Sequence, residues 1–170
     1  KRNTAIGSYA LYANTTGDNN TAIGRQASQN NTTGADNVSV GFYALQGNVT
    51  GCYNVAVGKC AARVYTKDST IAIGYEAMCA NDLGLYNTAI GYQAMKNTNS
   101  AAGSYNTAHG YQALLNNTTG EKNTAIGYQS MFANTSGEYN AAIGTDSLRA
   151  NTTGEQNVAL GHNSLYNNTF

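Results

Sequence analysis

Few residues of this chain have both the type and the spacing that catalysis or metal binding requires. The three cysteines, Cys52, Cys60 and Cys79, are an odd number without a Cys-x-x-Cys spacing, so they match neither a disulfide framework nor a zinc site. We interpret them as incidental, and a single Cys52–Cys60 or Cys60–Cys79 bridge is the alternative. His109 and His162 have no Cys, Asp or Glu partner at ligand spacing. We expect His109 to be a polar residue buried in the fold or on the axis of a trimer, rather than a metal or anion ligand.

The carboxylates follow a repeat instead of forming pairs. Glu121, Glu138 and Glu155 recur every 17 residues, each directly after a Thr-Thr-Gly or Thr-Ser-Gly sequence. We expect solvated charges at a corner of the fold, not an acid and a base that converge on a substrate. The sequence contains no nucleophile paired with a base, no phosphate-binding loop and no calcium-loop spacing. It therefore predicts no enzyme, no metal site and no cofactor.

The composition of the 170-residue chain argues against several partners. Nine basic residues balance nine acidic ones without forming a basic stripe, so nucleic acid and membrane lipid are poor partners. No run approaches the ~20 apolar residues of a membrane span, and the N-terminus lacks the features of a signal peptide. The hydrophobic residues are largely Ala and Tyr, with three Phe and no Trp. We expect a thin core that is repeated along one domain, residues 1–170.

One glycine marks a repeat along the whole chain. It closes a motif like Asn-Thr-Ala-Ile-Gly and recurs every 17 residues, apart from one interval of 16 and one of 19, at Gly7, Gly24, Gly41, Gly58, Gly74, Gly91, Gly110, Gly127, Gly144 and Gly161. The full unit, N-T-A-I-G-Y-Q-A-L-x-x-N-T-T-G-x-x, is clearest in residues 123–139. Two irregular stretches interrupt it: residues 62–69, with one residue fewer, and residues 96–105, with two more, where we expect an outward loop.

A 17-residue unit is too short for a pair of helices and suits one turn of a β-solenoid. The absence of proline fits a ladder in which every turn pairs with two neighbours. We expect an all-β fold, a parallel β-solenoid (β-roll) of about ten turns. Each turn should hold two short strands, Asn-Thr-Ala-Ile and Tyr-Gln-Ala-Leu, closed by Gly and Asn-Thr-Thr-Gly corners. A helix is the alternative for the second segment.

Columns of equivalent residues predict which side chains fill the solenoid. The Ile and Leu positions are apolar in most units, so we expect these two columns to face each other inside. The Ala between Thr and Ile should point outward, because side chains alternate along a strand, and a face of small residues would let another chain approach closely. The first Asn of the motif predicts a ladder of stacked amides. That ladder includes Asn20, Asn37, Asn54, Asn87, Asn106, Asn123, Asn140 and Asn157.

Three further columns are candidate surfaces. A tyrosine after the motif glycine suits contact with a protein or a sugar, or simply covers a strand edge or a neighbouring protomer; these residues are Tyr75, Tyr92, Tyr111 and Tyr128. The Asn of the Asn-Thr-Thr-Gly corner matches the glycosylation motif as well as turn chemistry; these residues are Asn14, Asn31, Asn48, Asn117, Asn134, Asn151 and Asn168. A Thr column at the second motif position, interrupted by aliphatic residues, leaves ice binding as an alternative function.

The Asn-Thr-Ala-Ile-Gly motif, followed by a small residue such as Ser130, Ser147 or Ser164, resembles the N-S-V-A-I-G-x-x-S repeat of YadA-type trimeric autotransporter adhesin heads. It is more similar still to the N-T-A-I-G-Y-Q-A-L-x-x-N-T-T-G repeats of tail-fibre-like surface proteins of phages and bacteria. The resemblance covers the whole chain. It implies a left-handed parallel β-roll, commonly trimeric, that attaches to matrix proteins, cells or glycans. The 17-residue unit and the lack of a heptad stalk depart from the adhesin pattern.

In such a family the repeat itself is the contact surface, so the resemblance implies no catalytic or ligand-binding residue. We expect a structural or adhesive segment of an extracellular fibre or surface adhesin, on a cell or virion, that associates with itself as a homotrimer or a head-to-tail filament. A matrix protein, a cell-surface protein or a glycan is the expected outside partner. A purely structural extracellular filament is the alternative. The end turns leave strand edges open, so we expect them to pair with further chain.

Overall fold

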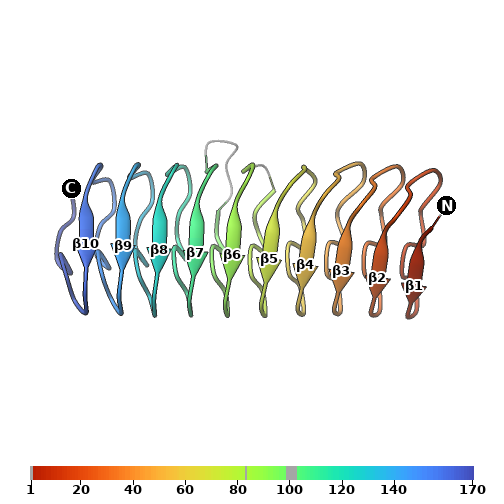
Figure 1. The fold of residues 1–170 in the computed structure, drawn as a ribbon, viewed down its shortest axis with the longest axis horizontal. Coiled ribbons are helices and arrows are strands. Elements are labelled where there is room, and N and C mark those ends of the chain that lie inside the picture. Colours follow the sequence, from red (N-terminus) through yellow and green to blue (C-terminus); the bar gives the residue numbers. More distant parts are fainter. Residues whose placement is uncertain (1, 83, 99–102) are drawn as a thin grey trace.

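The computed structural model describes residues 2–82, 84–98 and 103–170, so residues 99–102 of the irregular stretch 96–105 lie outside the described part. The chain forms a rod in which every turn contributes one short strand, and the strands lie side by side in chain order (Figure 1). Each strand has three residues: β1 (Thr4–Ile6), β2 (Thr21–Ile23), β3 (Val38–Val40), β4 (Val55–Val57), β5 (Ile71–Ile73), β6 (Thr88–Ile90), β7 (Thr107–His109), β8 (Thr124–Ile126), β9 (Ala141–Ile143) and β10 (Val158–Leu160). The β-branched residues at most first and third positions favour this extended backbone.

Each strand pairs in parallel with the strand of the next turn, and equivalent residues lie opposite each other. The register survives both irregular stretches, because Val55 of β4 pairs with Ile71 of β5 and Thr88 of β6 pairs with Thr107 of β7. All ten strands form one sheet. The prediction of an all-β parallel solenoid is therefore confirmed, and the described residues contain no helix.

The second segment of each turn is a run of tight turns, so the prediction of a second strand is wrong. After β6, Gln93 and Met95 both have left-handed backbone conformations, with φ of 54° and 51°, and the same two positions are left-handed in every turn. Their N–H groups still bond to neighbouring turns: that of Gln93 donates to the Tyr75 carbonyl at 2.9 Å, and that of Met95 to the Ala113 carbonyl at 3.0 Å. These bonds offset the free-energy cost of a backbone conformation that is uncommon in residues other than glycine.

The Ala position of each strand points into the solenoid and the Ile position points out, which is the opposite of the prediction. Ala89 is fully buried, whereas Ile90 is half-exposed. The Leu position does lie inside, as predicted, together with the Ala that precedes it. The continuous core is therefore built from small residues and one larger side chain in most turns, such as Leu45, Met78, Met95, Leu114, Met131 and Leu148.

The cross-section of the solenoid explains this inversion. A turn with one three-residue strand is too narrow to hold an Ile and a Leu side chain opposite each other, so the Leu or Met side chain fills it and only Ala fits across from it. Successive turns also touch closely at Gly91, where φ is 137° and a Cβ atom would collide with the carbonyl oxygen of Gly110. The expected outward face of alanines, and the close approach of another chain to it, are accordingly wrong.

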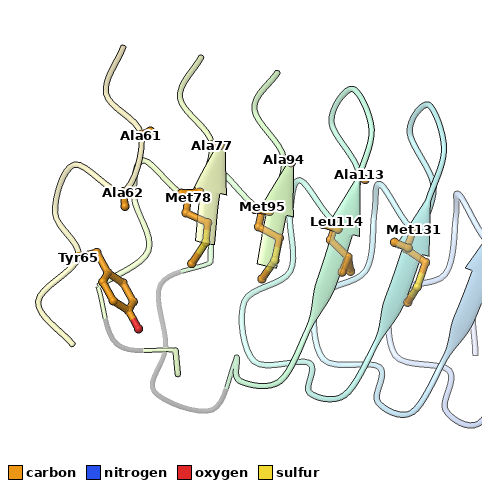
Figure 2. Close-up of a cluster of buried hydrophobic side chains, with 14 of the residues drawn as sticks. Ala61, Ala62, Tyr65, Ala77, Met78, Ala94, Met95, Ala113, Leu114 and Met131 are labelled. Carbon is orange, nitrogen blue, oxygen red and sulfur yellow. The ribbon is translucent and has the colours of Figure 1, made fainter. Parts of the chain in front are cut away.

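The irregular stretch 62–69 is accommodated inside the solenoid. Ala62 stands where most turns have Leu or Met, and Tyr65 stands where most turns have a buried Asn. The ring of Tyr65 is fully buried beside Ala62 and in line with Met78 (Figure 2). Its hydroxyl donates to the Asp68 carbonyl at 3.0 Å. One tyrosine thus fills the space that a Leu and an Asn occupy in other turns.

Candidate functional site

The first Asn of each motif forms a hydrogen-bonded column inside the solenoid. The Oδ1 atom of Asn106 accepts from the backbone N–H of Asn123 at 2.9 Å, and its Nδ2 atom donates to the Gly120 carbonyl at 2.9 Å. Each amide therefore closes its own turn and ties that turn to the next. The same pair of bonds is made by Asn20, Asn37, Asn54, Asn87, Asn123 and Asn140. Asn157 donates its backbone N–H to Asn140 at 2.9 Å and ends the column.

The Asn of the Asn-Thr-Thr-Gly corner forms a second internal column. Asn134 donates from Nδ2 to Oδ1 of Asn117 at 2.7 Å and also to the Gly137 carbonyl at 3.1 Å. A glycan on this nitrogen would prevent the turn from closing, and the side chain has no exposed surface. The structure therefore argues against glycosylation of the folded chain at the fully buried positions, which are Asn31, Asn48, Asn117, Asn134 and Asn151. Asn14 and Asn168, in the end turns, are half-buried.

The outward side chains of the strands form a continuous surface along the sheet, which we call the strand face. It consists of the first and third residue of every strand, β1 to β10. None of these positions carries Asp, Glu, Lys or Arg. Ile126 and Ile143 are 37% and 42% exposed, while Val57, Ile73 and Ile90 are half-buried. This uncharged surface is therefore on the side of the strands that the sequence predicted to face the interior.

His109 lies on the strand face, at the third position of β7 between Ile90 and Ile126. It is exposed. The prediction that the fold buries this histidine is therefore wrong, because the strand position it shares with isoleucine points outward. His162 is also exposed, and its Nε2 lies 3.0 Å from Nδ2 of Asn163.

The four candidate tyrosines form one stack along the rod, which we call the tyrosine stack. Neighbouring ring centroids of Tyr75, Tyr92, Tyr111 and Tyr128 are 5.1 Å apart, and the ring planes differ by only 6–8°. Lys59 lies 5.4 Å from the Tyr75 ring centroid at one end. Because the rings cover one another's faces, they present edges and hydroxyl groups to solvent. This arrangement suits hydrogen bonding to a partner better than stacking of a sugar on a ring face.

A chain of amide hydrogen bonds accompanies the tyrosine stack. Gln129 donates to Gln112 at 2.9 Å, Gln112 to Gln93 at 3.0 Å, and Gln93 to the carboxylate of Glu76 at 2.8 Å. Arg149 donates to the other end, at Gln129, over 3.1 Å. A charged donor and a charged acceptor therefore terminate the chain, which orients all three amides in one direction.

Lys96 and Tyr75 also contact the carboxylate end of this chain. Lys96 lies 2.7 Å from Oε2 of Glu76. The hydrogen bond from Lys96, followed by that from Gln93, holds the pKa of Glu76 below its usual value. The same ion pair raises the pKa of Lys96, and a hydrogen bond with Glu76 raises the pKa of the Tyr75 hydroxyl. Both partners of the pair are therefore ionised at neutral pH.

All three cysteines are free, so neither a Cys52–Cys60 nor a Cys60–Cys79 disulfide is present. Cys60 is buried, and burial raises the pKa of Cys79 to about 11. Cys52 is half-exposed, and its Sγ atom accepts from the backbone N–H of Ala35 at 3.3 Å. A thiol with a raised pKa is a poor nucleophile at neutral pH, so Cys79 is not an activated cysteine.

Comparison of the chain with protein-family models, curated proteins and solved structures found no match. Within residues 2–82, 84–98 and 103–170 there is no pocket and no group of three His, Cys, Asp or Glu side chains placed to hold a metal ion. The same residues include no helix with the length and apolar composition of a membrane span. The carboxylates of Glu121, Glu138 and Glu155 lie at the corner, half-exposed or exposed. The strand face and the tyrosine stack remain as the candidate functional surfaces.

Sequence reasoning missed the strand face and the amide chain for different reasons. Alternation along a strand separates the Ala and Ile positions but does not say which set is inside. The amide chain was visible as a Gln column, Gln93, Gln112 and Gln129, which starts at Glu76, while Arg149 stands three positions after the column's next member. Its charged ends were the available signal, but only the fold brings Arg149 next to Gln129.

Proposed function

We propose that this chain is a structural or adhesive segment of an extracellular fibre or surface adhesin, and that it associates with further copies of itself through the strand face. The observation that carries the proposal is the Ile- and Val-rich surface without Asp, Glu, Lys or Arg that runs over all ten strands. Apolar patches of this extent on a soluble rod favour a protein partner. In such a fibre the rod supplies stiffness and a contact surface repeated once per turn, with no catalytic role.

A second copy is the occupant that this surface fits best. Two rods have the same strand spacing of about 4.8 Å, so every outward Ile or Val on one copy can meet an equivalent residue on the other. The strand face is about 43 Å long and about 10 Å wide. Its area is therefore roughly half of the ~800 Å² that each partner contributes to a standard interface. We therefore expect the contact to extend to neighbouring columns, as it would in a trimer where each copy meets two others.

The mass of the native particle tests this proposal. The monomer has a mass of 17.8 kDa, and we expect a particle near three times that value by light scattering. A large polydisperse mass would instead support the filament alternative. A clean monomer at the highest soluble concentration would contradict self-association in both forms.

Matched charge substitutions locate the contact surface. Ile90→Glu with Ile126→Glu places two carboxylates on the strand face, and we expect this variant to be monomeric. Thr33→Glu with Thr50→Glu adds the same charge at exposed corner positions and should keep the wild-type mass. Circular dichroism shows whether each variant keeps its fold. Equal masses for both folded variants would place the contact elsewhere.

A matrix protein, a cell-surface protein or a glycan remains the proposed outside partner, and the tyrosine stack is the surface that we assign to it. Its row of hydroxyl groups offers repeated hydrogen-bond donors and acceptors. Many weak contacts along one rod give strong attachment through avidity. Binding to immobilised matrix proteins and glycans, compared between wild type and a Tyr92→Ala, Tyr111→Ala variant, tests this assignment.

Ice binding is the second candidate, and the outward direction of the Thr column favours it. Thr88, Thr107 and Thr124 lie at the first position of three consecutive strands, where their hydroxyl groups can order water at regular spacing. Thermal hysteresis of the monomer tests this function. Hysteresis that disappears in a Thr107→Leu, Thr124→Leu variant would favour ice binding over self-association as the role of the strand face.

A further inference from the structure

The tyrosine stack brings four phenol groups into contact outside the core. Each ring lies nearly parallel to the next at a centroid distance of 5.1 Å, so the ortho carbons of one ring lie close to their equivalents on the next. The side chains are 37–47% exposed, so an oxidant in solution can reach them. None of the four tyrosines belongs to the buried core.

We propose that Tyr75, Tyr92, Tyr111 and Tyr128 are a site of oxidative cross-linking, in which neighbouring rings are joined as dityrosine by a peroxidase and hydrogen peroxide. Each of two phenols loses one electron and one proton and becomes a phenoxyl radical with spin density at its ortho carbons. The two radicals form one carbon–carbon bond between ortho carbons. The two ring hydrogens then move to the phenol oxygens, which restores both aromatic rings. Overall two tyrosines lose two hydrogen atoms, and one peroxide is reduced to two water molecules.

The tyrosines of the stack differ from exposed tyrosines such as Tyr53 and Tyr139 because each lies next to another tyrosine. Tyr53 is 65% exposed, but the equivalent positions in the turns on either side of it hold Asp36 and Ser69. Tyr139 is likewise flanked in its column by Lys122 and Gln156, and the amine of Lys122 lies 2.7 Å from its hydroxyl. Among the described residues, neither tyrosine therefore has a second phenol at the equivalent position of a neighbouring turn. In the stack, Tyr92 and Tyr111 each have a phenol on both sides.

Two other tyrosine pairs are close enough to react and belong in the test. Tyr86 and Tyr105 stack at 5.2 Å with an interplanar angle of 23°, and Tyr9 and Tyr12 meet edge to face at 5.4 Å. In the part of the chain that the structure describes, neither pair has a third tyrosine ring stacked on it. We therefore expect the largest share of intramolecular cross-links in the four-membered stack.

Such cross-links would reinforce the rod. Each one joins residues 17 or 19 positions apart along the chain, and so locks two successive turns together in a protein whose cysteines are free. Closing a loop of this length restricts the unfolded chain, as a disulfide does. The proposal does not depend on self-association, because the reacting rings belong to one chain.

The experiment treats the dilute protein with peroxidase and hydrogen peroxide and follows dityrosine fluorescence. Tryptic peptides are then mapped by mass spectrometry. A Tyr111–Tyr128 cross-link joins peptide 97–122 to peptide 123–149 and lowers their summed mass by two hydrogen atoms. We expect this product, together with a Tyr92–Tyr111 cross-link between peptides 68–96 and 97–122 and a Tyr75–Tyr92 cross-link within peptide 68–96. The chain should stay at monomer mass on a denaturing gel.

Two double variants provide the comparison. Tyr92→Phe with Tyr111→Phe keeps the stack of rings but leaves no two phenols adjacent in it, and we expect a loss of more than half of the intramolecular dityrosine. Tyr53→Phe with Tyr139→Phe removes the same number of phenols and should leave the yield unchanged. Cross-links that form mainly through Tyr53 or Tyr139, or an equal yield from both variants, would overturn the proposal.

Discussion

Lys96 and Glu76 form a 2.7 Å ion pair at the end of the amide chain, one turn apart on the rod. The pair anchors three glutamines through Gln93, and it holds the pKa of Glu76 below its ordinary value of 4.5. A carboxyl group with a lower pKa in the folded state binds fewer protons there than in the unfolded state. It therefore contributes stability above the unfolded pKa, and this contribution is lost as the pH falls through the folded value.

We predict that the pair makes part of the stability acid-sensitive. The Tm of the wild type should fall between about pH 5 and about pH 3 by more than that of Glu76→Gln, which cannot titrate at this position. Thermal denaturation followed by circular dichroism at each pH measures the difference. At neutral pH, the Tm of Lys96→Met should lie below that of the wild type by the amount that the wild type loses on acidification. Parallel pH curves for wild type and Glu76→Gln would contradict the prediction.

Replacement of Tyr65 should show how much the irregular turn depends on one side chain. Tyr65→Ala empties the space beside Ala62, and we expect a loss of about 3–5 kcal/mol in the free energy of unfolding. Tyr65→Phe keeps the ring and removes only the hydrogen bond to the Asp68 carbonyl, so its cost should be about 1 kcal/mol. Urea denaturation measures both. A similar cost for the two variants would mean that the hydroxyl, not the ring, is the important group.

Two glycines with similar positive φ values allow the cost of the backbone conformation to be distinguished from the cost of a collision between turns. Gly91 and Gly161 have φ of 137° and 117°, but a Cβ atom on Gly161 meets no atom within 4 Å in this chain, whereas one on Gly91 collides with Gly110. We expect Gly161→Ala to cost about 1–3 kcal/mol and Gly91→Ala about 1–3 kcal/mol more. Urea denaturation of the two variants checks this order, and equal costs would show that neighbouring turns move apart easily.

Two serines in different columns of the sequence form one hydrogen bond in the core. The hydroxyl of Ser28, at a Leu position, donates to that of Ser39, at an Ala position, over 2.9 Å. Ser39→Ala should cost about 1–2 kcal/mol, because it leaves the Ser28 hydroxyl without this partner. Ser28→Leu combined with Ser39→Ala restores the usual pair of residues and should be more stable than either single variant. Additive effects in this double-mutant cycle would show that the two serines are independent.

The sequence alone determined the repeat, and with it the parallel solenoid and its register. Gly7 to Gly161 recur at nearly constant spacing, and each motif must pair with its copy one turn away, so the order of the ten strands follows from the chain itself. The internal Asn column was also predictable, since equivalent amides recur once per turn and each buried amide must find hydrogen-bond partners.

The tertiary structure decided which side of each strand is inside. Strand alternation leaves two solutions, and the hydrophobicity of Ile90 favoured the wrong one over Ala89. The choice depends on the width of the lumen, which the left-handed turns at positions such as Gln93 and Met95 make too narrow for a second large side chain. The width of the lumen depends on how the whole turn closes, so the sequence of the strand alone does not determine it. For the same physical reason, the exposed Ile and Val surface became visible only in the folded rod.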